Sequence, residues 1–282
     1  MRRRLPLLIG LLLLGACDPM GGALQRKPPL AAAAAAPEGM VRIPAGPFTM
    51  GTDEEDVDGR GAELGLMVPW FDTAHPAHPV DLAAYFIDAT EVTNGAYGAF
   101  VAATGHQPPP HWQGPAPPQG LETHPVTHVS WHDAESYCNG RGGTLPTEAQ
   151  WEKAARGTDG RAYPWGSTYT HDAANVARGH TLPVGSVAGG DSPYGVKDLI
   201  GNVWEWTADW YQPYPGGTYQ DDRFGTTVKV LRGNSWASVG HYPDQRDFMD
   251  IVANNSRATY RLFLDPAGRL NDVGFRCVQP TP

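Results

Sequence analysis

Short runs of alternating apolar and polar residues, separated by Gly- and Pro-rich segments, fill most of the chain after residue 40. The run 40–51 alternates in this way and contains a Pro-Ala-Gly turn, which predicts strand structure. Residues 78–82 lead into a second strand-like run at 85–88. Beyond residue 157, short strand-like runs alternate with loops up to residue 277. The pattern predicts sheets made of short strands.

Three segments carry helix signals instead. Apolar residues within 91–101 recur at a spacing that places them on one helical face. A second helix is predicted to begin after the N-cap residue Ser130 and to end at Gly140. A third is predicted between a capping-box pattern at Thr147 and a C-terminal Gly157. Few helices among many short strands and loops predict an α+β fold with little regular secondary structure.

The N-terminus has the pattern of an export signal. Residues 2–4 are all Arg, residues 5–14 are mostly apolar, and Leu-Gly-Ala-Cys ends the segment at Cys17. The apolar run is too short for a permanent membrane span and predicts a signal peptide. Its last four residues resemble the lipobox of bacterial lipoproteins, whose cysteine is acylated and becomes the new N-terminus. The alternative is an ordinary signal peptide that is cut near Ala16.

This signal divides the chain into three predicted parts. Residues 1–17 form the lipoprotein signal peptide, residues 18–37 a flexible tether rich in Pro, Gly and Ala, and residues 38–282 one domain. A lipid on Cys17 would anchor the domain at the periplasmic face of a bacterial membrane. Asp18 resembles a retention signal for the inner membrane, so that membrane is favoured.

Charge and composition narrow the class of function. The formal net charge is −9, and loss of the three Arg in residues 2–4 lowers it to −12. An acidic chain without Lys/Arg clusters argues against nucleic-acid binding and against electrostatic binding to anionic lipid. The 34 Gly, 27 Pro and 9 Trp indicate a domain rich in turns and irregular loops that aromatic side chains hold in place.

Eight short motifs follow one another in the domain: Ile43–Gly51, Glu91–Asn94, Pro125–Trp131, Leu145–Glu152, Tyr163–Gly166, Gly201–Trp206, Leu231–Trp236 and Val273–Cys277. In this order they resemble the formylglycine-generating enzyme family, or sulfatase-modifying factor domain, from about residue 40 to residue 278. No single motif is specific, but eight in one order over the whole domain are.

The resemblance implies an irregular α+β fold related to C-type lectins. In the family archetype, Cu(I) held by two cysteines activates oxygen, and a cysteine of a secreted sulfatase is oxidised to formylglycine. Thiolates suit this chemistry because they are soft ligands that select Cu(I). The matching positions in this chain are Ser238 and Pro243. Neither residue can replace a thiolate, so we expect no copper cofactor here.

Apart from Cys17, the sequence contains two cysteines, Cys138 and Cys277. An even number of cysteines in an oxidising compartment favours a disulfide. Both residues match family positions that form a structural disulfide between the helix after Ser130 and the C-terminal strand. The alternative is two buried free thiols.

The resemblance also implies a structural calcium site. In the family, the matching positions bind Ca²⁺ through the side chains of Asp198 and Glu205 and the carbonyls of Gly201 and Val203. Carboxylates beside a turn supply the hard oxygen ligands that Ca²⁺ prefers. The alternative is that Glu205 only packs among neighbouring tryptophans. A second family site would begin near Asn175, but we find no counterparts for its other ligands.

A candidate groove is expected around the positions of the missing cysteines. The Pro-rich loop 107–120, with His111 and Trp112, would form its rim. The other histidines lack the spacing of a metal site on a helix and are interpreted as hydrogen-bonded loop residues. The residues predicted to line the groove are Ser235, Trp236, Ser238, His241 and Trp204.

Three functions follow as hypotheses. The first is an accessory lipoprotein that binds an envelope protein or peptide near the membrane. The second is a periplasmic oxidoreductase or maturation factor, similar to the family member that finishes the pyoverdine chromophore and also lacks the copper cysteines. The third, a sulfatase-activating formylglycine-generating oxidase, ranks last. The first is favoured because the recognised catalytic features of the archetype are missing.

Overall fold

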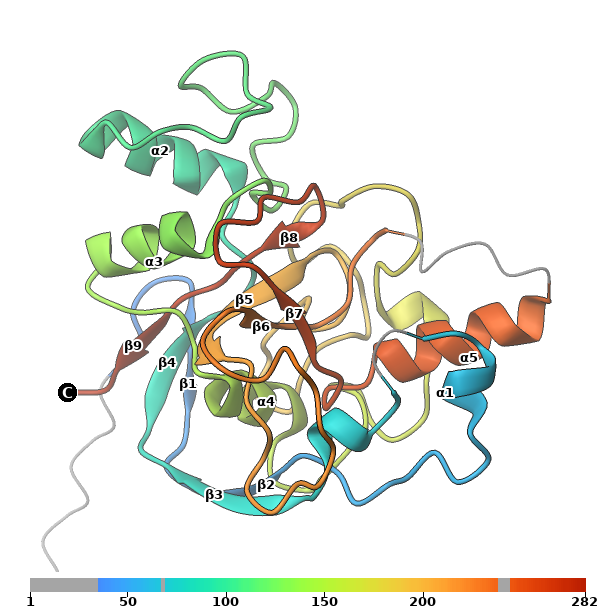
Figure 1. Ribbon diagram of the computed structural model, residues 1–282. Helices are drawn as coiled ribbons and strands as arrows, with labels where there is room; N and C mark the ends of the chain where they lie inside the picture. The colour runs from blue at the N-terminus through green and yellow to red at the C-terminus, as the bar shows by residue number, and fades with distance from the viewer. Residues whose placement is uncertain (1–34, 67–68, 238–243) are drawn as a thin grey trace, which may run out of the picture. The chain divides into compact units, whose positions relative to one another are not determined.

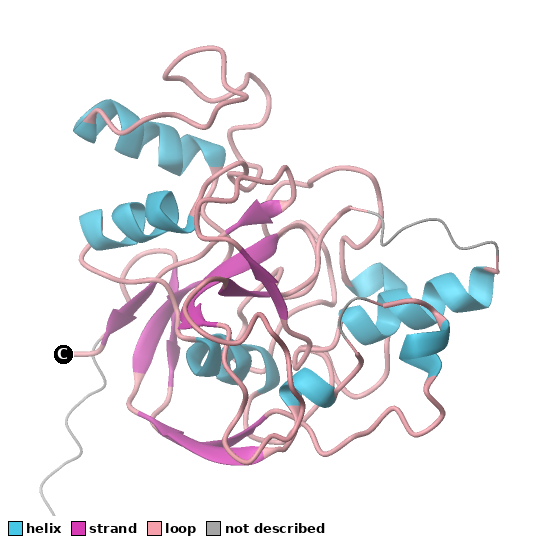
Figure 2. Ribbon diagram, viewed as in Figure 1, coloured by secondary structure: helices cyan, strands magenta, loops and turns pink. Residues whose placement is uncertain are grey.

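Three small sheets make up the strand structure of the computed structural model, which describes residues 35–66, 69–237 and 244–282 (Figures 1 and 2). The strands are β1 (Met40–Ile43), β2 (Gly46–Met50), β3 (His78–Leu82), β4 (Tyr85–Asp88), β5 (Trp204–Trp210), β6 (Lys229–Arg232), β7 (Leu262–Leu264), β8 (Val273–Gly274) and β9 (Val278–Pro280). The sheets have the orders β1-β4-β9, β2-β3 and β7-β6-β5-β8. The pair β5–β8 is parallel, and the other pairs are antiparallel.

The helices are α1 (Arg60–Glu63), α2 (Asn94–Thr104), α3 (Trp131–Gly140), α4 (Glu148–Arg156) and α5 (Gln245–Asn255), with 3-10 turns at Asp72–Ala74 and His171–Ala173. In Figure 1, α2 and α3 lie side by side at one end, and α5 lies beside α1 at the other. Few helices and many loops confirm the predicted α+β fold. The described residues belong to one compact unit, which extends to residue 282. No helix in its described residues is long and apolar enough to cross a membrane.

The predicted strand structure at 40–51 is confirmed, although its two halves belong to different sheets. β1 pairs with β4, whereas β2 pairs with β3. The break falls at Pro44, which has no N–H to donate, and is followed by Gly46 at a φ of 122°. The predicted strand at 85–88 is confirmed as β4, and all four of its residues are buried.

The three predicted helices are also confirmed, and their caps explain where they begin. The side chain of Thr93 accepts a hydrogen bond from a first-turn N–H of α2. Ser130 and Thr147 form complete capping boxes at the starts of α3 and α4. These bonds satisfy N–H groups that have no partner inside the helix. Gly157 ends α4 with a φ of 67°, which favours glycine.

One helix, α5, is missing from the sequence prediction. Strand-like runs and loops are predicted after residue 157, but residues 245–255 are helical. Asp244 caps this helix, and Ile251 and Val252 are buried while Phe248 packs beside them. The spacing of these three apolar residues is helical. The prediction was wrong because so short an apolar stripe is easily taken for part of a loop.

Two hydrophobic clusters hold the loops and strands in place. The first joins α2 and α3 to the central sheet and contains Tyr97, Trp206 and Phe275, each at most 1% exposed. The second contains Trp151 of α4 and Ile87 of β4, both fully buried. Full burial of a large apolar side chain contributes roughly 1.5–3 kcal/mol. Aromatic and aliphatic contacts therefore fix a fold that has few long elements.

Candidate functional site

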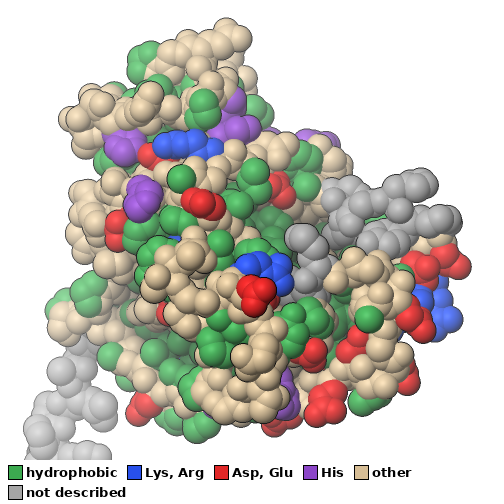
Figure 3. All heavy atoms as spheres, viewed as in Figure 1, with side chains coloured by type: hydrophobic (Ala, Val, Ile, Leu, Met, Phe, Trp, Pro, Cys, Tyr) green, Lys and Arg blue, Asp and Glu red, His purple; other side chains and the backbone are tan. Residues whose placement is uncertain are grey.

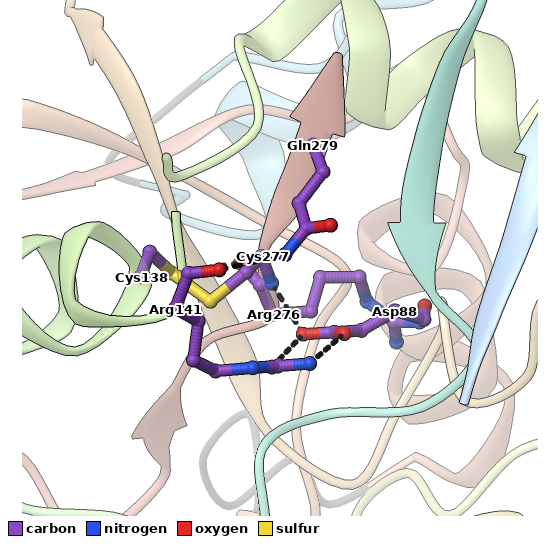
Figure 4. Close-up of a disulfide and its surroundings, with 6 residues drawn as sticks. All are labelled: Asp88, Cys138, Arg141, Arg276, Cys277 and Gln279. Carbon is purple, nitrogen blue, oxygen red and sulfur yellow. Dashed lines mark hydrogen bonds and ion pairs between the residues drawn. A yellow bond between two sulfur atoms is a disulfide. The ribbon is translucent and has the colours of Figure 1, made fainter. Parts of the chain in front are cut away.

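A disulfide joins Cys138 in α3 to Cys277 just before β9 (Figure 4). This bond confirms the predicted pairing and spans a sequence separation of 139 residues. Beside it, the guanidinium of Arg141 donates to both carboxylate oxygens of Asp88, at 3.0 and 3.1 Å. Asp88 also accepts from the N–H of Cys277 at 2.9 Å. These contacts fix the C-terminal motif against β4.

The C-terminal motif places Arg276 in the interior, next to Glu205. The guanidinium donates from Nε and Nη2 to the two carboxylate oxygens of Glu205, in each case at 2.7 Å. Trp151 Nε1 donates to the same carboxylate at 2.9 Å. Glu205 and Arg276 are both 0% exposed. The pair is bidentate and dry, so Glu205 already has a strong ionic partner.

Two more buried carboxyl groups, those of Glu91 and Asp198, lie beside this ion pair. The two groups are within hydrogen-bonding reach of each other, and Asp198 also accepts from the N–H of Gly185. Neither carboxylate oxygen of Glu91 has a hydrogen-bond partner among the described residues. Burial, and next the charge of Asp198, raise the pKa of Glu91 well above its usual value. Burial also raises the pKa of Asp198.

The predicted calcium ligands therefore differ in whether their carboxylate groups already have a positively charged partner. Asp198 and its neighbour Glu91 fit a hard cation, because their carboxyl oxygens are buried with too little positive charge around them. Glu205 fits less well, because Arg276 already occupies both of its oxygens. In the described ranges, no three His, Cys, Asp or Glu side chains gather so that they could hold a metal ion. Backbone carbonyls or water would have to complete a site at Asp198.

Two predicted groove residues, Ser235 and Trp204, contact Asp272, which the sequence reasoning missed. The hydroxyl of Ser235, a residue only 1% exposed, donates to Asp272 Oδ2 at 2.8 Å. The N–H of Trp204 donates to the Asp272 carbonyl at 2.8 Å, and the N–H of Trp236 donates to the Asn202 carbonyl at 3.0 Å. The loop after β6, the start of β5 and the segment before β8 thus converge. The only signal for Asp272 is its place directly before the last motif.

The remaining groove predictions are tested only in part. Ser238 and His241 lie outside the described residues, as does Cys17. Trp236 is partly exposed, and its Nε1 is buried without a hydrogen-bond partner among the described residues. The ring centroid of Trp204 lies 6.1 Å from that of Tyr260. The described part of the groove is therefore aromatic, with one unpaired N–H donor.

A pair of histidines lies near Asp272. The ring centroids of His111 and His128 are 4.2 Å apart. His128 has a left-handed backbone, with a φ of 57°, and its N–H donates to the Leu270 carbonyl at 2.8 Å. Burial lowers the pKa of His128 and lowers that of His111 to about 4. Figure 3 shows that histidines gather toward the end of the domain that carries α2.

The Pro-rich loop is confirmed as a loop, but Trp112 does not lie at a rim. Trp112 is 6% exposed and packs edge-on against Tyr97, with ring centroids 6.2 Å apart. The prediction was wrong because a large apolar ring gains free energy from burial, here against α2. His111, the next residue toward the N-terminus, is exposed over part of its surface, while its ring lies against that of His128.

Comparison with known families agrees with this architecture. The profile described as "Sulfatase-modifying factor enzyme 1-like domain" matches residues 26–281. The chain belongs to this family. The resemblance that eight motifs indicated is therefore confirmed. The match begins at residue 26, after the segment that is predicted to be the export signal.

Relatives in the family differ in activity. The chain is 35% identical to inactive C-alpha-formylglycine-generating enzyme 2 of Mus musculus, over 84% of each chain. It is 31% identical to the formylglycine-generating enzyme of Streptomyces coelicolor, over 85% of this chain and 88% of the relative. The solved structure of PvdO from Pseudomonas aeruginosa has a TM-score of 0.62 and 27% identity, over 86% of this chain and 94% of that chain. Overall similarity therefore does not separate an active from an inactive member.

Proposed function

We propose that this family member is an accessory envelope lipoprotein that binds a protein or peptide partner. The observation that carries the proposal is the number and pairing of the cysteines. Cys138 and Cys277 are joined to each other, and the sequence contains one further cysteine, Cys17. No thiol thus remains within the family domain to hold Cu(I), and the positions that match the copper ligands are Ser238 and Pro243.

The described surface near these positions supports binding. Trp236 is partly exposed, and aromatic side chains supply much of the contact energy of protein interfaces. Acylated Cys17 would hold the domain at the periplasmic face of the inner membrane. A structural Ca²⁺ would stiffen it.

Site-specific photo-crosslinking in the producing cells tests this function. A photoreactive residue replaces exposed His111 near the groove, and a control places it at Val57, which is 81% exposed and lies in the loop before α1. We expect a discrete adduct from position 111 that Trp236→Ala removes, and none from position 57. Equal adducts from both positions, or an adduct that ignores Trp236→Ala, would contradict binding at this groove.

A second candidate function is that of a periplasmic oxidoreductase or maturation factor. The likeness to PvdO over nearly the full domain favours it, together with the Ser235–Asp272 hydrogen bond beside the neutral histidine pair. Oxygen consumption with periplasmic peptides measures this activity, with Ser235→Ala as the test variant and exposed Ser167→Ala as its control. Turnover that only Ser235→Ala abolishes would favour the enzyme over the accessory protein.

A further inference from the structure

Two histidines from separate loops lie against each other beside the groove. His111 belongs to the Pro-rich loop that follows α2, and His128 belongs to the turn that precedes α3. Their ring centroids are 4.2 Å apart, and the ring planes differ by 32°. The pair does not have the spacing of metal-binding histidines on one helix, so the sequence pattern did not indicate it. The tertiary structure brings the two imidazoles together.

The hydrogen bonds of this pair leave ring nitrogens available. Nδ1 of His128 contacts the hydroxyl of Thr127 at 3.1 Å. Among the described residues, neither Nε2 of His128 nor either ring nitrogen of His111 has a hydrogen-bond partner. When Nδ1 of His128 donates its bond, Nε2 carries the lone pair that a metal ion needs. Metal-binding imidazoles are commonly oriented in this way, by a hydrogen bond at the second nitrogen.

The charge around the pair also suits a cation. Burial lowers the pKa of His128 and lowers that of His111 to about 4, so both rings are neutral at pH 7. Neutral imidazole is the form that binds metal ions. The negative charge of Asp272 beside His128 favours a positive ion there. Arg269 donates to the His128 carbonyl at 3.3 Å, but Asp133 compensates its charge at 2.5 Å.

We propose that His111 and His128 together bind a divalent transition-metal ion of the class of Zn²⁺. Imidazole nitrogens suit such ions. With Zn–N bonds of about 2.0–2.1 Å, two rings on one tetrahedral ion have their centres roughly 5 Å apart. The observed 4.2 Å is close to this value, and His111 is exposed over part of its surface, so a small shift of its ring is sufficient.

The ion would join the Pro-rich loop to the turn before α3. In the described ranges, no third His, Cys, Asp or Glu side chain completes a ligand set with this pair, so water supplies the remaining ligands. Such a site has open positions, as catalytic zinc sites do, and structural zinc sites do not. The inference goes beyond the proposed function and does not depend on it.

Zinc titration of the full chain in detergent, followed by isothermal titration calorimetry, tests the site. The chain is first treated with a chelator and then kept in excess Ca²⁺, so that zinc does not report on the proposed calcium site. We expect one Zn²⁺ per chain. His111→Asn and His128→Asn should each weaken zinc binding at least about tenfold, because losing a residue that only supports a ligand already costs that much. Asn also tolerates the left-handed backbone of His128.

The matched control is His132→Asn, at an exposed histidine of α3, which should leave the zinc affinity unchanged. The melting temperature without zinc verifies that each variant is folded. Zinc should also slow hydrogen exchange in residues 107–120 of the parent and of His132→Asn, but not of His111→Asn. Zinc affinity that survives both the His111 and His128 substitutions would place the ion elsewhere and overturn the proposal. If the parent binds no zinc, the pair is only an aromatic contact and the proposal fails, while partner binding is untouched.

Discussion

Neutralising Glu152 should destabilise the domain far more than neutralising any exposed carboxylate. Glu152 is fully buried in α4, and its carboxylate accepts three hydrogen bonds. The donors are the N–H of Gly51 at 2.8 Å, Arg156 Nη1 at 2.8 Å and Arg232 Nη2 at 2.7 Å. Glu152→Gln keeps the shape of the side chain but removes the charge that compensates two buried guanidinium groups.

The expected loss follows from what remains after the substitution. Removing one partner of a buried ion pair costs about 3–5 kcal/mol. The lower end applies here, because an amide oxygen in the place of Oε1 still accepts from Gly51 and Arg156, and Glu148 still accepts from Arg232 at 2.7 Å. A loss of about 3 kcal/mol lowers the melting temperature of a domain of this size by roughly 6–12 °C.

Urea unfolding followed by tryptophan fluorescence measures the free energy of unfolding directly. Glu63→Gln is the matched control, and it should change that free energy by less than about 0.5 kcal/mol because its ion pair with Arg60 is on the surface. A loss below about 1 kcal/mol in Glu152→Gln would refute the reasoning. It would mean that water or another acceptor replaces the carboxylate in solution.

Two other predictions concern stability. The double variant Cys138→Ala/Cys277→Ala should lose about 3–5 kcal/mol in urea unfolding, because a link across 139 residues strongly restricts the unfolded chain; an unchanged midpoint would contradict this. The lowered pKa of His128 means that the folded chain favours the neutral ring, so the unfolded chain binds more protons below pH 6.5. The free energy of unfolding should therefore fall as the pH drops through 6.5, and His128→Asn, which tolerates the left-handed backbone, should flatten that pH dependence.

Family membership alone leaves the activity open, because named relatives at similar identity include an inactive and an active formylglycine-generating enzyme. Whether a family member is active depends on a few side chains. Cys138 and Cys277 are joined to each other, and the positions that match the family's copper ligands are Ser238 and Pro243, so we expect no Cu(I) site.

The sequence by itself determined the features that depend on neighbours in the chain. The caps at Ser130 and Thr147 fix helix starts through bonds to residues three positions later. Pro44 separates one strand from the next because proline has no backbone N–H to donate, which is a property of that single residue. The order of eight motifs was enough to identify the family.

Only the tertiary structure decided which distant residues become partners. Glu205 meets Arg276 across 71 residues, and Glu91 meets Asp198 across the gap between two motifs. The calcium ligands implied by the family read as equivalent in sequence, because each is simply an oxygen-bearing residue at the expected spacing. Burial distinguishes them. In a dry interior, a carboxylate that pairs with a guanidinium group has its charge compensated, whereas a carboxylate without such a partner must bind a cation or a proton.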